Sequence, residues 1–314
     1  MGLTPARQRL GRLKDTWSIA RETWEDGRRH AAYAAAVDRR SGLPAGTRQL
    51  EAQITKDYHR IEKGLSLRTP RAGFGAAVAA RLRRDLPRYA ALPGHDPAVL
   101  AHGRSALDAL ALWHAEAQLA DDGPTRRPPA SAGLDPDEVG ALFRSRTSVR
   151  DFAPDPLDPA LVRRAAELAL HSPSVCNRQA WAVWAFHDRL AVERVAALQN
   201  GSAGFRESIP CLLVIGVDTR LFAGSAERNQ RWVDGGLYAM SLVWALHGLG
   251  VATCMLNWSV GHRRTRELRA LTGIPDHVDV VTMVAAGLPR AGLRVARSPR
   301  RRVDDVLQQG TTAR

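Results

Sequence analysis

Arginine and serine alternate in one short stretch of the chain, in a pattern suited to binding an anion. The segment RSRTSVRDF, residues 144–152, places Arg146, Ser148 and Arg150 at every second position. In an extended backbone these three side chains project from the same side. Two guanidinium groups supply charge and forked donors for a phosphate monoester, and the hydroxyl adds one further hydrogen bond. Taken alone, such a turn in an arginine-rich protein is more often a solvated surface.

A second segment is rich in small and amide side chains. The stretch SPSVCNRQAW, residues 172–181, carries Ser174, Asn177 and Gln179 between an expected helix and an expected strand. Amide side chains offer both donors and acceptors, which suits the mixed polar edge of a flat heterocycle. The alternative is a helix-ending turn that satisfies its own backbone through local hydrogen bonds.

A third segment is the basic stretch GLPRAGLRVARSPRRRVDDV, residues 287–306, which follows the last expected strand. One or two of its arginines could return to the same phosphate as Arg146. The alternative is a basic tail without a ligand.

The order and separation of these three segments resemble the FMN-dependent nitroreductase family. The pattern R-x-S-x-R-x-F is followed about twenty residues later by P-S-x-x-N-x-Q-x-W, and a basic element follows the last strand. Residues 234–249, running into GLGVATCMLNW, resemble the long central helix of the family and the loop that passes its flavin. The resemblance covers about Asp137 to Leu307.

The resemblance implies a set of FMN contacts. The phosphate and ribityl chain would be held by Arg146, Ser148 and Arg150, and the phosphate site would be completed by Arg297 and Arg300. The loop at the ring would be formed or supported by Pro173, Ser174, Asn177 and Gln179. Backbone groups of Leu256 and Asn257 would lie beside the ring.

The resemblance also implies an activity and an assembly. We expect an FMN oxidoreductase in which NAD(P)H and then an electron-poor acceptor of nitro, quinone or enone type react in turn, by ping-pong hydride transfer. The sequence shows no triad or carboxylate pair at a recognisable spacing, so we assign no catalytic acid or base and no metal ligand. Family members are typically homodimers, and Trp232, Tyr238 and Trp244 are expected either at a dimer face or in the core.

The periodicity of apolar residues predicts an α+β protein. We expect a nitroreductase-like three-layer fold, with a central mixed sheet flanked by helices and an all-helical region before it. Strands are predicted over residues 180–186, 211–217 and 278–287, with a strand and loop in the stretch beginning at Val251. A helix is predicted over 158–171, with Asp158 as N-cap and Pro159 at its first position. A long apolar helix is predicted over 232–249.

The chain is expected to divide into a helical N-terminal extension over residues 1–120, a Pro/Gly-rich linker over 121–136 and the FMN-binding domain over 137–310. The stretches at residues 58–75 and 227–236 resemble a subgroup of nitroreductase-like proteins with such an extension. A helix of the extension is expected to bring together three polar side chains, those of His59, Glu62 and Lys63. This cluster could be an ion-pair network, an interface or a second active site.

Composition disfavours several other classes of protein. The net charge is +13, but all but 3 of the 45 basic residues are arginines spread over the whole chain, so we do not expect a nucleic-acid partner. Three widely spaced cysteines without a CxxC pattern argue against a disulfide framework or zinc site. No apolar run predicts a membrane span or an export signal, so a cytoplasmic protein is expected.

Two alternatives remain at this stage. The first is a flavin-binding protein that does not turn over, or one that consumes flavin as its substrate. The second is a basic protein that binds nucleic acid or another polymer.

Overall fold

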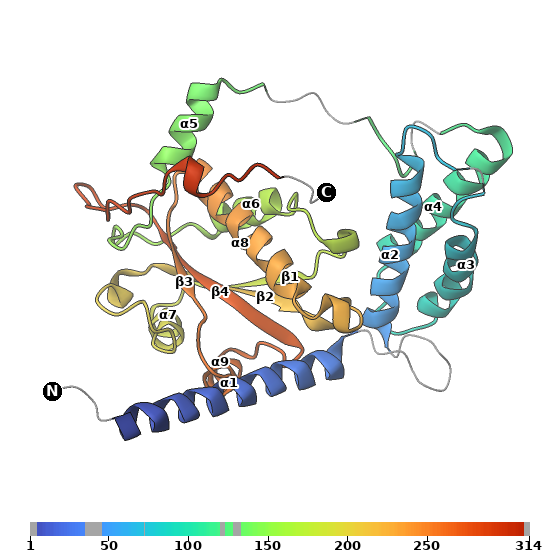
Figure 1. Cartoon of the computed structure of the whole chain (residues 1–314). Coiled ribbons are helices and arrows are strands. Elements are labelled where there is room, and N and C mark those ends of the chain that lie inside the picture. The colour runs from blue at the N-terminus through green and yellow to red at the C-terminus, as the bar shows by residue number, and fades with distance from the viewer. Residues whose placement is uncertain (1–4, 35–45, 72, 120–122, 128–132, 311–314) are drawn as a thin grey trace.

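A computed structural model describes residues 5–34, 46–71, 73–119, 123–127 and 133–310, with side chains from Lys14 onward. It confirms the α+β class, with helices before and around one sheet (Figure 1).

The sheet contains four strands in the order β1-β2-β4-β3. All three strand pairings are antiparallel. In the described part of the chain, one isolated parallel bridge joins Ser148 to Thr253 of the sheet. The predicted mixed character of the sheet rests on this bridge alone. The strands are β1 (Trp181–Phe186), β2 (Cys211–Asp218), β3 (Ala252–Asn257) and β4 (Val278–Gly287).

The two central strands are apolar because both of their faces are covered. Every residue of β2 is buried, and so is every residue of β4 except Val281. The short apolar run at residues 211–217 therefore predicted its strand correctly.

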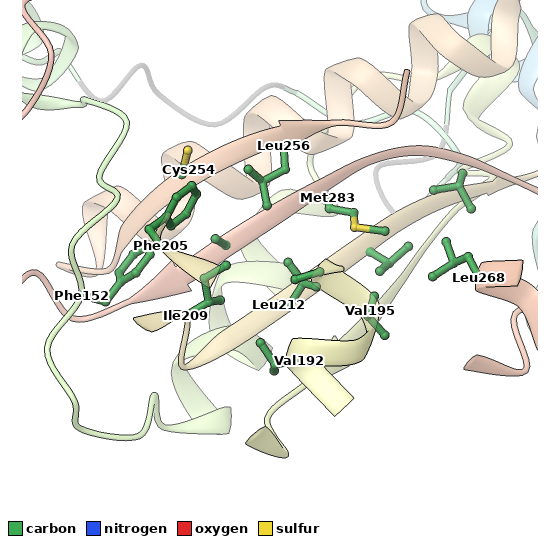
Figure 2. Close-up of a cluster of buried hydrophobic side chains, with 14 of the residues drawn as sticks. Phe152, Val192, Val195, Phe205, Ile209, Leu212, Cys254, Leu256, Leu268 and Met283 are labelled. Carbon is green, nitrogen blue, oxygen red and sulfur yellow. The ribbon is translucent and has the colours of Figure 1, made fainter. Parts of the chain in front are cut away.

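Helices cover both faces of the sheet, which confirms the three-layer arrangement. On one face, α6 (Pro159–Ala169) and α8 (Gln230–Gly248) pack on Leu213 and Ile215. On the other face, α7 (Arg189–Ala196) and α9 (His262–Thr272) pack on Leu212 and Met283 (Figure 2). The short helix α5 (Pro136–Ser145) precedes these layers. The predicted cap of α6 is confirmed, since the carboxylate of Asp158 accepts a hydrogen bond from the amide of Ala160 at 2.8 Å.

The helical N-terminal region consists of two parts that pack differently. Helices α2 (Thr47–Leu65), α3 (Ala76–Ala90) and α4 (Pro97–Glu116) share a core that includes Ile54, Ile61, Leu82 and Tyr89. Helix α1 (Pro5–Tyr33) lies apart from this group and runs along the body that contains the sheet, close to α9 (Figure 1).

A buried ion cluster fixes α1 to the sheet. The guanidinium of Arg29, only 5% exposed, binds the carboxylate of Asp279 on β4 and that of Asp276, each at 2.9 Å. Arg231 of α8 also contacts the Asp279 carboxylate, at 2.7 Å, and Thr219 donates a hydrogen bond to it at 3.0 Å. Burial lowers the pKa of the nearby Arg269, and the charge of Arg29 lowers it further. The carboxylate of Asp279 is therefore the counter-charge shared by the buried guanidinium groups of Arg29 and Arg231.

The predicted linker, residues 121–136, lies partly outside the described residues, and α5 begins at its end. None of the helices in the described part of the chain has the length and apolar character needed to cross a membrane.

Replacing Asp279 by Asn should release α1. The change leaves buried guanidinium groups without their counter-charge, and breaking a buried pair in this way costs about 3–5 kcal/mol. Urea unfolding would measure the loss of stability, and hydrogen exchange over residues 21–33 would report the release of α1. Asp304→Asn is the control, because Asp304 is 74% exposed. Unchanged stability and exchange in Asp279→Asn would contradict this anchoring role.

Candidate cofactor-binding site

The predicted phosphate-binding segment runs beside the open edge of the sheet. Arg146 caps the C-terminus of α5 in an extended conformation, and Ser148 pairs with Thr253 of β3. The amide of Val149 donates to the carbonyl of Thr253 at 2.9 Å. Val149 is buried, whereas Ser148 is partly exposed and Arg150 is exposed. The alternation expected from the sequence is therefore present over these residues.

The cations predicted to hold the phosphate are not neutralised by the protein. In the described part of the chain, Arg146, Arg150, Arg297 and Arg300 form no ion pair with a carboxylate, although their neighbours Arg290 and Arg302 do. The guanidinium of Arg146 instead lies 6.0 Å from the centre of the Trp244 ring. Burial and the charge of Arg146 together lower the pKa of His247. Such a set of donors without counter-charge fits a phosphate group.

The basic tail begins beside the same segment. Pro289 pairs with Phe152, and Arg290 binds the carboxylate of Asp151 through its guanidinium nitrogen Nε, at 2.7 Å. Arg297 and Arg300 lie further along the tail and are exposed. The guanidinium of Arg300 donates to the carbonyl of Ser298.

The predicted ring-contacting loop is held at the start of α8. The amide of Val175 donates to the buried carboxylate of Asp234 at 3.1 Å. Three residues of the loop have left-handed backbones, with φ of +49° at Cys176, +53° at Asn177 and +47° at Gln179. Left-handed backbone costs roughly 1–2 kcal/mol per residue outside glycine. Strain concentrated in this way is typical of functional loops.

Helix α2 packs over this loop. Ala52 of α2 shares a buried cluster with Ala180, Leu221 and Phe222. Asn177 and Gln179 line a cavity of about 330 Å³ whose other wall comes from α2 and α4. The ring nitrogen Nδ1 of His59 lies 3.3 Å from a carboxylate oxygen of Glu62, which can accept a hydrogen bond from it. Burial raises the pKa of Glu62. Glu62 lines this cavity, so part of the polar cluster predicted in the extension faces the loop.

Leu256 and Asn257 lie at the end of β3. Leu256 is buried in the core, and Asn257 is exposed and lines a second cavity, of about 700 Å³, beneath α1. The side-chain amide of Gln199 donates to the backbone carbonyl of Asn257 at 3.0 Å and to its side-chain oxygen at 3.2 Å. The four-residue step along β3 from Thr253 places Asn257 about 13 Å from the phosphate-binding segment.

The two predicted groups of residues lie at opposite ends of α8 in one chain. Asp234, near its start, holds the loop of Asn177, while Trp244, near its end, contacts Arg146. Ten helical residues separate them by about 15 Å. Within one chain, β3 therefore runs from the segment of Arg146 and Ser148 to Asn257. The loop that carries Asn177 and Gln179 lies at the other end of α8 from Arg146.

The aromatic residues of α8 have separate roles. Tyr238 is buried and stacks on Trp181, with ring centres 4.9 Å apart, so it belongs to the core. Trp232 is 39% exposed and Trp244 is half-buried. The role of Asp234 as loop anchor was not predicted from the sequence, although an acidic residue in a mostly apolar helix is a visible signal.

Two of the three cysteines, Cys211 and Cys254, are buried free thiols. Burial raises the pKa of the Cys211 thiol to about 12. Burial also raises the pKa of the Cys254 thiol, and the positive charge of Arg150 lowers that pKa by a smaller amount. Within the residues that the structure describes, no cluster of three or more His, Cys, Asp or Glu side chains is placed to hold a metal ion.

Comparison with known proteins identifies the domain that carries this site. Residues 143–288 match the model of the family described as the nitroreductase family. This part of the chain is therefore similar to the nitroreductase family. The matched residues include Arg146, the loop around Asn177, all of α8 and β3. Helices α1 to α4 precede the match, so the nitroreductase fold begins after the helical region.

Individual relatives cover the same half of the chain. An "NADH dehydrogenase" of Thermus thermophilus is 26% identical over an alignment 177 residues long, which covers 46% of this chain and 83% of the relative. The structure of an FMN-dependent nitroreductase of Clostridium difficile covers 54% of this chain and 98% of its own, with 15% identity and a TM-score of 0.47. The structure of a nitroreductase with bound FMN from Desulfitobacterium hafniense covers 55% and 98%, with 21% identity and a TM-score of 0.44.

Glycine at position 179 should relieve backbone strain in the predicted ring-contacting loop. Because Gln179 has φ of +47°, Gln179→Gly should raise the free energy of unfolding by up to about 1 kcal/mol. Gln179→Ala removes the same side chain but keeps the strained backbone, and should show no such gain. Thermal unfolding of the two variants measures the difference. Equal stabilities would show that the loop stores no strain at this position.

Proposed function

We propose that this protein is an FMN-dependent oxidoreductase that uses NAD(P)H to reduce a small electron-poor acceptor of nitro, quinone or enone type. The family match of residues 143–288 supports this function. The observation that carries it is that Arg146 and Arg150, which form no ion pair in the described part of the chain, flank Ser148 beside β3, a strand that leads directly to Asn257. This arrangement fits a ligand with a phosphate at one end and a planar ring at the other.

The residues of the chain would bind and orient rather than transfer protons. Arg146, Ser148 and Arg150, with Arg300 and Arg297, would hold the phosphate. Backbone groups at Leu256 and Asn257 would lie beside the ring. When bound, FMN would supply the two-electron redox chemistry that links NAD(P)H to the acceptor. No acid or base side chain is assigned to this cycle.

We also propose that the protein acts as a homodimer in which a second copy completes the site. The loop of Pro173, Ser174, Asn177 and Gln179 lies at the opposite end of α8 from the phosphate-binding segment of its own chain, about 15 Å away along the helix. A twofold axis that places the start of one α8 near the end of the other would unite the two groups.

An exposed apolar stripe on α8 supports this assembly. Val233 is 51% and Leu237 is 42% exposed, and the half-buried Met240 and Trp244 continue the stripe at helical spacing. Phe143 of α5 is 62% exposed and extends the stripe, with its ring centre 4.6 Å from that of Trp244. An exposed apolar surface of this kind is typical of an interface.

The remaining proposals concern the whole chain. Residues 137–310 would form the flavin-binding domain, with residues 1–120 as its helical extension and 121–136 as the linker. A cytoplasmic location fits a supply of NAD(P)H for this reaction.

Removing the phosphate ligands should lower FMN affinity. Arg146→Ala combined with Ser148→Ala should weaken binding by about 1.5–3 kcal/mol for each charged hydrogen bond lost. Arg144→Ala is the matched control, because Arg144 lies two residues away on α5 and is exposed. Titration of flavin into the purified apoproteins measures the effect. Full flavin occupancy in the double variant would argue against the phosphate site.

A charge on the α8 stripe should disrupt the dimer. Leu237→Glu would place a carboxylate in an apolar interface, and the protein should become monomeric and lose its flavin together. Leu190→Glu is the control, because Leu190 is 62% exposed on α7, away from the stripe. Light scattering gives the mass, and absorbance gives the flavin content. A Leu237→Glu dimer that keeps its flavin would contradict the proposed interface.

A further inference from the structure

The cavity beneath α1 lies where the proposed flavin site ends. Its volume is about 700 Å³, within the range of small-molecule sites. Asn257 and Trp258 at the end of β3 form one wall, and Ser18 and Glu22 of α1 form another. Helix α1 lies outside the part of the chain that matches the nitroreductase family. The extension thus contributes directly to a cavity next to the residue expected beside the flavin ring.

Two tryptophans from different elements line this cavity. Trp258 follows β3, and its indole nitrogen donates to the hydroxyl of Thr265 at 3.1 Å, which fixes its ring. Trp232 lies near the start of α8, with the guanidinium of Arg231 5.0 Å from its ring centre. Indole rings held in place in this way offer flat apolar surfaces for an aromatic ligand.

Polar groups at the cavity can orient such a ligand. The hydroxyls of Ser18 and Ser259 are donors of the kind that quinone or nitro oxygens accept. The acidic groups of the wall are already engaged. Glu22 accepts from the amide of His262 at 2.9 Å, and Asp26 lies 3.2 Å from the ring nitrogen Nε2 of His262.

The α1 wall is held in position without a ligand. The ion cluster of Arg29 and Asp279 anchors its C-terminal half, and the bond from His262 to Glu22 holds the turn before it. The cavity is therefore preformed, and binding need not order α1.

We propose that this cavity binds the electron acceptor, and that the acceptor is a flat aromatic molecule packed against Trp232 and Trp258. The proposal rests on the function proposed above, because Asn257 relates the cavity to the flavin. It assigns to α1 a role in choosing the acceptor, which would pass through the cavity in alternation with the nicotinamide.

Binding of 1,4-naphthoquinone to the purified full-length protein tests this proposal. Ser18→Trp fills the cavity from α1 and should weaken binding at least 10-fold, measured by calorimetry. Ala20→Trp adds the same side chain at an exposed position that does not line the cavity, and should leave binding unchanged. Trp232→Leu should weaken binding about 3- to 10-fold through loss of stacking. The steady-state KM for the quinone should rise in the same order.

The outcomes separate the two proposals. Equal affinity in Ser18→Trp and Ala20→Trp would overturn the cavity assignment even if both contain FMN. Loss of FMN in Ser18→Trp alone would also overturn it, because the cavity would then belong to the cofactor. If the wild-type protein contains no FMN, the oxidoreductase function fails, and the binding comparison still decides what the cavity holds.

Discussion

Helix α8 separates the two segments that the proposed cofactor needs. It is 19 residues long and packs on the sheet along its length, so it cannot bend to bring its ends together. Asp234 fixes the loop of Asn177 at one end, and Trp244 contacts Arg146 at the other. In the proposed dimer, a second α8 in the opposite orientation would complete the site. The exposed Val233 and Leu237 are available for that contact.

The helical extension is built onto this frame at two places. Helix α2 packs over the strained loop that carries Asn177 and Gln179. Helix α1 is anchored by Arg29 and encloses the cavity at the end of β3. Each contact lies where one half of the proposed site ends. In the proposed function, the extension would therefore border the flavin site at both places and could take part in the choice of acceptor.

Local sequence signals predicted most elements of the fold. Asp158 and Pro159 marked the start of α6, and continuous apolar runs marked β2 and β4, because capping and burial act over a few residues. The order of motifs predicted the family. The docking of α1 was not predictable in this way. The pair of Arg29 and Asp279 is separated by 250 residues and leaves no periodic pattern in either segment.

The candidate site was predictable in its parts but not in its assembly. The alternation of Arg146, Ser148 and Arg150 follows from an extended backbone, and it is present in the structure. The distance between these residues and Asn177 depends on which ends of α8 they contact, and spacing along the chain does not encode that. The same holds for Trp258 and Ser18, which meet at one cavity only because α1 docks there.

Mixed dimers test the central claim, that each flavin site is shared between two copies. One copy, with one affinity tag, would carry Arg146→Ala and Ser148→Ala, and the other, with a different tag, would carry Ser174→Ala and Asn177→Ala. If the site is shared, the doubly purified heterodimer keeps one intact site and should bind flavin, although each parent homodimer binds it poorly. A heterodimer with as little flavin as both parents would contradict the account, because every site would then lie within a single chain.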